Sequence, residues 1–155
     1  MRSLVATLAL TCLPLTALAK PWQGMEPGVS TREDVVRRFG KASKTVTSEG
    51  RELFAYFGKE GIRGTTQAQF KFDALGKVER IDVFPAPVID RRTIENSYGV
   101  ACPAGPLPAR PCYLRKITDD FKTYYLYPKL GLAIFFKDDE QSVHSFIFTT
   151  PGAAK

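Results

Sequence analysis

The sequence predicts an α+β protein built of two tandem units, each a short helix followed by an antiparallel meander of strands. Two helix-like segments end in an aromatic–glycine pair, one at Phe39 and Gly40 and the other at Tyr98 and Gly99. Alternating apolar residues follow each segment in short runs, and turn-forming residues separate the runs. The 155 residues suffice for one compact domain or for two small fused halves.

The N-terminus has the pattern of a cleavable signal peptide. Arg2 is the only charge before Lys20, an apolar run lies between them, and residues 17–19 supply the small-x-small cleavage site. No stretch reaches the roughly 20 apolar residues that span a bilayer. A lipid-attachment motif needs a small residue before its cysteine, and Thr11 stands before Cys12. We therefore expect residues 1–19 to be removed and the mature chain to be soluble, periplasmic or secreted.

The charge of the chain is mildly basic. The formal net charge is +6, of which Arg2 contributes one unit, and acidic and basic residues are interspersed. This balance fits contact with an acidic protein surface or with anionic lipid, although it does not require either. The pairs Arg37-Arg38 and Arg91-Arg92 favour lipid, but such pairs are more often solvated helix faces. Nucleic acid is not expected as a partner, because the compartment is wrong and no basic run exceeds two residues.

The first unit, residues 20–86, begins with a helix predicted over residues 30–40. Ser30 and Glu33 form the pattern of a capping box, and Val35 and Phe39 lie on one apolar stripe. Gly40 can adopt the left-handed conformation that ends a helix. Strands are predicted over residues 44–47, 52–57, 66–73 and 77–84, with a tight hairpin turn at 73–76.

The second unit, residues 87–155, repeats this order. Asp90 caps a helix predicted over residues 90–99, and Ile94 and Tyr98 form its apolar stripe. A shift of 59 positions places Val35 on Ile94 and Phe39 on Tyr98. Strands are predicted over residues 114–118, 122–127, 132–137 and 142–148, and residues 138–141 form the last turn.

Two cysteines, Cys102 and Cys112, remain after the leader is removed. In an exported chain, an even pair within a stretch rich in proline and glycine predicts a disulfide. Closing this loop of 11 residues stabilises the fold by roughly 2.8 kcal/mol on the chain-entropy model. The alternative is a metal or redox pair. The spacing matches neither Cys-x-x-Cys nor a zinc site, and His144 is the only histidine.

A set of residues in the first unit carries a family resemblance: Gly28, Ser30, Val35, Phe39, Gly40, Phe70, Phe72, Asp73, Gly76 and Val78. Their pattern resembles the SmpA/OmlA (BamE-like) proteins of bacterial outer membranes. It is equally similar to the secreted β-lactamase inhibitory protein (BLIP-like) group, whose fold is a tandem of that unit. The resemblance covers residues 22–85 well and residues 87–151 weakly. It implies the fold first, and then either an interaction module of the cell envelope or an enzyme inhibitor.

The sequence contains no recognisable active site. A single histidine leaves no Cys–His or metal–histidine scheme, and His144 is expected at a strand surface. The acidic groups at 119–120 and 138–140 lie at predicted turns, where carboxylates commonly stay solvated. The glycines at 58, 61 and 64 precede no helix and so form no phosphate loop. We predict no catalytic, cofactor or metal residues, and a protein that is not an enzyme.

Strand alternation predicts a binding surface in the second unit. Phe70, Phe72, Ile81 and Val83 would face the helix of the first unit, with polar neighbours on the opposite face. The second unit has apolar residues on both faces, because Ile134, Phe136, Phe146 and Phe148 alternate with apolar neighbours. The candidates for contact with a protein partner are Phe135, Ile147, Tyr124 and Tyr125.

Two alternatives to this binding surface stay open. The second face could be covered within the protein, either by residues 22–25 or by the proline-rich disulfide loop. A further candidate contact is the hairpin tip at residues 58–64, which would display Ile62 and Arg63, although an ordinary flexible loop explains it as well.

Overall fold

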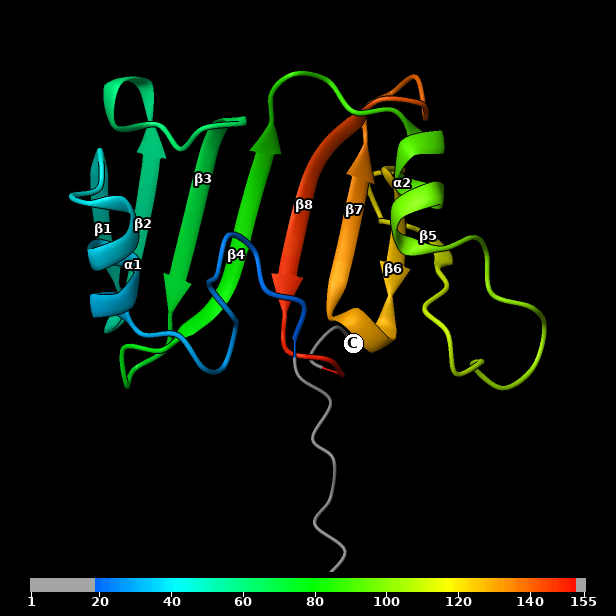
Figure 1. Ribbon diagram of the computed structural model, residues 1–155, viewed down its shortest axis with the longest axis horizontal. Helices are drawn as coiled ribbons and strands as arrows, with labels where there is room; N and C mark the ends of the chain where they lie inside the picture. The colour runs from blue at the N-terminus through cyan, green and yellow to red at the C-terminus, as the bar shows by residue number, and fades with distance from the viewer. Residues whose placement is uncertain (1–18, 153–155) are drawn as a thin grey trace, which may run out of the picture.

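The computed structural model describes residues 19–152, so the predicted leader lies outside them apart from Ala19. Within this range the chain forms two α-helices and eight β-strands (Figure 1). The first half contains α1 (Arg32–Phe39), β1 (Lys44–Ser48), β2 (Arg51–Phe57), β3 (Thr65–Phe72) and β4 (Val78–Pro85). The second half contains α2 (Arg91–Tyr98), β5 (Leu114–Ile117), β6 (Thr123–Tyr127), β7 (Leu132–Phe136) and β8 (Val143–Thr149). No helix among the described residues is long and apolar enough to cross a membrane.

All eight strands belong to one antiparallel sheet, in the order β1-β2-β3-β4-β8-β7-β6-β5. The central pairing is between β4 and β8, where Ile81 lies opposite Phe148 and Val83 opposite Phe146. The prediction of two tandem helix-plus-meander units is therefore wrong. The halves share backbone hydrogen bonds along β4 and β8, and the sheet dominates the fold, with only two eight-residue helices.

Both helices begin and end where side chains satisfy their free backbone groups. The capping box of α1 uses Thr31 and Asp34, one residue later than the predicted Ser30 and Glu33. Asp90 caps α2, as predicted, by accepting the N–H of Thr93 at 2.7 Å. Gly40 and Gly99 end the two helices, also as predicted.

Each helix covers the same face of the sheet, which we call the inner face. Phe39 of α1 contacts Tyr56 and Phe70, and Tyr98 of α2 contacts Tyr127 and Phe146. The buried tyrosines also close the helix ends. The Tyr56 hydroxyl donates to the carbonyl of Gly40 at 3.0 Å, and the Tyr127 hydroxyl donates to that of Gly99 at 2.9 Å.

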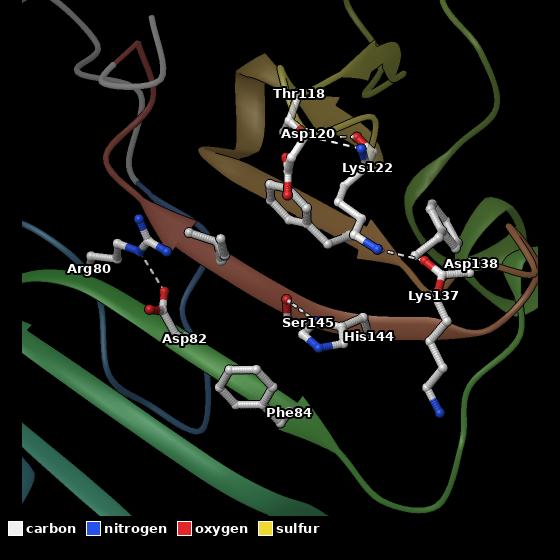
Figure 2. A pocket seen from close by; sticks show the side chains of 13 residues that line it. Arg80, Asp82, Phe84, Thr118, Asp120, Lys122, Lys137, Asp138, His144 and Ser145 are labelled. Carbon is white, nitrogen blue, oxygen red and sulfur yellow. Dashed lines mark hydrogen bonds and ion pairs between the residues drawn. The ribbon is translucent and has the colours of Figure 1, made fainter.

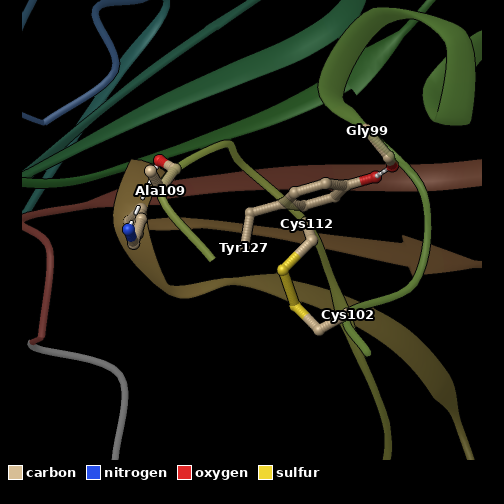
Figure 3. Close-up of a disulfide and its surroundings, with 6 residues drawn as sticks. Gly99, Cys102, Ala109, Cys112 and Tyr127 are labelled. Carbon is tan, nitrogen blue, oxygen red and sulfur yellow. Dashed lines mark hydrogen bonds between the residues drawn. A yellow bond between two sulfur atoms is a disulfide. The ribbon is translucent and has the colours of Figure 1, made fainter. Parts of the chain in front are cut away.

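The disulfide between Cys102 and Cys112 is present, as the sequence predicts, with the Cα atoms 4.9 Å apart (Figure 3). The loop that it closes returns to α2, where a Cβ added at Gly99 would collide with the carbonyl oxygen of Pro111. The φ angle at position 99 is 106°, so glycine is the one residue type that fits both this backbone conformation and the close approach of Pro111. The disulfide therefore holds the loop against the end of α2.

Candidate functional site

The face of the sheet that the helices leave uncovered is the outer face, and strands β6 to β8 make it apolar. Burial alternates along β6 and β7, and the residues between the fully buried ones are half-buried. Tyr124 and Phe135 lie opposite each other on these strands and stack with ring centroids 4.7 Å apart. Ile147 of β8 lies on the same face, opposite Ala133. Three of the four predicted residues therefore form one surface.

Neither segment that could have covered this surface does so. Trp22 of the N-terminal segment packs on the inner face, with its ring centroid 6.0 Å from those of Phe39 and Phe70. The disulfide loop leads to Tyr113, which stacks on Tyr125, also on the inner face. Neither the N-terminal segment nor the disulfide loop therefore covers the apolar part of the outer face.

A groove of about 640 Å³ is formed on the outer face (Figure 2). Its apolar lining comes chiefly from Phe84 of β4, Phe135 of β7 and Ile147 of β8. The hairpin between β5 and β6 forms one side with Thr118, Asp120 and Lys122, and further polar residues complete the rim: Arg80, Asp82, Lys137, Asp138, His144 and Ser145. The volume lies within the range of about 300–1,000 Å³ that is common for binding pockets.

The outer face changes from apolar to polar between β8 and β4. Strand register aligns Leu126, Ala133 and Ile147 across β6, β7 and β8. The same row continues with Asp82 on β4 and Gln69 on β3. The groove therefore lies at the boundary, where Phe135 and Ile147 meet Arg80 and Asp82.

The charges around the groove are only partly paired. Asp82 is 6% exposed, and Arg80 and Lys71 both contact its carboxylate, the latter at 3.6 Å. Lys122 pairs with Asp138 at 2.6 Å; their hydrogen bond raises the pKa of Lys122 and lowers that of Asp138. These contacts neutralise two of the acidic groups at the rim.

The groove holds a histidine and a serine, but their arrangement is not that of a catalytic site. The Nδ1 atom of His144 lies 3.2 Å from the Oγ atom of Ser145, and its ring contacts Phe84 edge-on. Among the described residues, no carboxylate hydrogen-bonds to His144 to orient it as a base. Residues 19–152 also contain no group of three or more histidine, cysteine or acidic side chains placed to bind a metal ion. The geometry instead suits the binding of an apolar group.

The other predicted contact residues lie elsewhere. Tyr125 is 4% exposed and belongs to the core, because its side chain alternates to the inner face and Tyr113 covers it. Ile62 is 7% exposed and also packs into the core, so the prediction that the hairpin displays it is wrong. Residues 58–60 form a 3-10 turn that carries the chain back toward the sheet. Arg63 is exposed and is not part of the groove lining; its carbonyl accepts a hydrogen bond from the Gln23 side chain at 3.3 Å.

Sequence reasoning missed two aromatic residues of this region. Phe84 continues the outward alternation of Arg80 and Asp82, a signal that the pattern of β4 contains. Phe121 is 88% exposed, at the turn between β5 and β6. A large aromatic residue in a turn, where glycine or asparagine is usual, is the signal that could have identified it.

Comparison with known proteins yields one informative fold likeness. No family model matches the chain, and no curated protein matches it. The chain is similar in structure to a DUF4309 family protein (YjgB) from Bacillus subtilis subsp. subtilis str. 168, with a TM-score of 0.52 and 17% sequence identity over 83% of each chain. At this identity the likeness concerns the fold alone.

This likeness overturns the predicted resemblance to SmpA/OmlA (BamE-like) and BLIP-like proteins. The neighbour shares a sheet-dominated fold of the DUF4309 type. The residues that carried the resemblance are helix caps, turn residues and inner-face residues, such as Gly40, Gly76 and Phe70. Any short helix packed on an antiparallel sheet needs such residues, so their pattern does not distinguish the families.

Proposed function

We propose that this protein is an exported, non-enzymatic binding module of the cell envelope that holds a protein partner in the groove of its outer face. The observation that carries the proposal is the uncovered apolar surface of Phe84, Phe135, Ile147 and Tyr124. Aromatic clusters of this kind, bordered by polar groups, are typical of protein interfaces.

A protein partner fits the outer face better than anionic lipid does. The basic pairs that favoured lipid lie on the two helices, which cover the opposite face of the sheet. Arg37 is already paired with Asp34 at 2.9 Å. The groove itself has acidic and basic groups in alternation around an apolar floor, as a polypeptide with mixed side chains would require.

Site-specific photo-crosslinking tests the proposal. A photoreactive phenylalanine analogue would replace Phe135 in the groove, and the matched control would replace Gln69, which lies on the polar part of the same face. We expect a discrete polypeptide adduct from position 135 in envelope extract and none from position 69. Ile147→Asp should abolish the adduct while thermal unfolding shows an intact fold.

Equal labelling at both positions, or an adduct that survives Ile147→Asp, would contradict the proposal. The identity of the adduct also separates two forms of the function. An envelope component indicates an interaction module, whereas a single hydrolase indicates an enzyme inhibitor.

A further inference from the structure

Phe121 is presented to solvent in a way that the fold does not require. It stands in the turn of the β5–β6 hairpin, and its side chain is 88% exposed. Its φ angle is +60°, in the left-handed region that bulky side chains rarely adopt. Strained residues of this type persist where the surrounding structure holds them, and they are concentrated at functional sites.

Hydrogen bonds within the hairpin fix the backbone at Phe121. The N–H of Phe121 donates to the carbonyl of Thr118 at 2.9 Å, and the N–H of Lys122 donates to the Thr118 hydroxyl at 2.9 Å. The ion pair of Lys122 with Asp138 ties the hairpin to the end of β7. A fixed backbone position presents the ring at one place on the surface and lowers the entropy that is lost when it binds.

This projecting ring lies beside the groove. The flanking residues Asp120 and Lys122 form one side of the groove, whereas Phe121 is not part of its lining. The groove is large enough for an aromatic ring, since a cavity of about 150 Å³ already takes benzene. One patch of the protein therefore contains both an exposed aromatic ring and an apolar recess that could receive one.

The hairpin carries acidic groups without ion pairs, and basic side chains lie at the two ends of the groove. On the hairpin, Asp119 and Asp120 directly precede Phe121, and neither forms an ion pair within residues 19–152. On the groove, Lys137 forms no ion pair within the same residues, and Arg80 contacts Asp82 through Nε. Figure 2 shows Arg80 and Lys137 at opposite ends of the groove, with Phe84 and His144 between them.

We propose that the patch is self-complementary and that two copies of the chain associate about a two-fold axis. Phe121 of each copy enters the groove of the other, with Asp119 and Asp120 near Lys137 and Arg80. An isologous interface of this type needs one surface that carries both a projection and the matching recess. The inference rests on the groove of the proposed function and names a second copy as a partner that fits it.

Sedimentation equilibrium of the purified exported protein tests this inference, beginning with Phe121→Gly. Glycine relieves the positive φ angle, so the variant should unfold at the same temperature as the wild type or higher. It should nevertheless weaken dimer formation at least about tenfold, as the loss of an aromatic anchor does. Leu75→Ser is the matched control, because Leu75 is 86% exposed in the β3–β4 turn, and its dissociation constant should not change.

A charge exchange tests the pairing directly. Lys137→Glu should weaken the dimer, and adding Asp119→Lys and Asp120→Lys to the same chain should restore it. A dissociation constant of about 1 mM lies at the weak end of specific association. A protein that stays monomeric up to about this concentration would therefore overturn the inference. A dimer that Phe121→Gly leaves unchanged would overturn it too. The proposed function fails separately, through the absence of a specific adduct at position 135.

Discussion

Strands β3 and β4 and strands β7 and β8 have the same kind of inner face and different outer faces. Phe70 and Ile81 on one pair and Ile134 and Phe148 on the other are all buried on the inner face. Outward, the first pair presents Gln69, Lys71 and Arg80, with the apolar Phe84 only at the end of β4. The second pair presents Phe135 and Ile147.

The comparison separates two demands on one sheet. The inner face must pack against the two helices and their connecting segments. Both halves meet this demand with large apolar residues that point inward. The outer face has no such demand, because neither helix packs on it. Its apolar character in the second half is therefore the feature that the fold leaves unexplained, and the proposed contact with a partner would account for it.

The largest expected effect concerns a feature that only the second half has. The double variant Cys102→Ser, Cys112→Ser removes the covalent closure of an 11-residue loop and should lower the free energy of unfolding by roughly 2.8 kcal/mol. Urea unfolding of the variant and of the reduced wild type measures this change. The two should agree. A loss below about 1 kcal/mol would show that the inner face holds the loop without the disulfide.

A smaller effect should be shared by the halves. Tyr56→Phe and Tyr127→Phe each leave the carbonyl of a helix-ending glycine, Gly40 or Gly99, without its donor. Each variant should lose about 1–2 kcal/mol of unfolding free energy, as partly buried acceptors do when their partner is removed. Parallel chemical unfolding experiments check the equality. Losses of unfolding free energy that differ by more than about 1 kcal/mol would show that the two inner faces are not equivalent.

The smallest effect appears only in acid and concerns the turn before β8. The Asp139 carboxylate accepts hydrogen bonds from the Ser142 hydroxyl and from the N–H groups of Ser142 and Gln141, which lower its pKa from 3.8 to about 2. A lowered pKa contributes stability above the unfolded value, and that stability is lost as the pH falls from about 4 to about 2. Asp139→Asn should flatten this part of the stability profile.

Thermal unfolding between pH 2 and pH 5 measures the profile. Ser142→Ala serves as the control, because it removes the strongest of these hydrogen bonds and should move the transition toward pH 4. An unchanged profile in both variants would show that the turn contributes nothing to acid stability.

Features that depend on neighbouring residues could be predicted from the sequence. The helix ends at Gly40 and Gly99 follow from backbone conformations that few other residues adopt. Strand alternation placed Phe135 and Ile147 on the outer face, because successive side chains on a strand point in opposite directions. The disulfide followed from the cysteine count and the predicted export signal.

Features that depend on distant residues were decided by the tertiary structure. The pairing of β4 with β8 joined the predicted units into one sheet, and no local pattern specifies which strand edges will meet. Tyr125 is a core residue because Tyr113, from a distant part of the chain, stacks on it. Ile62 is a core residue because the segment after η1 (Gly58–Glu60) turns back toward the sheet. The groove brings together β4, β7, β8 and the β5–β6 hairpin, so its existence depends on packing across the whole sheet.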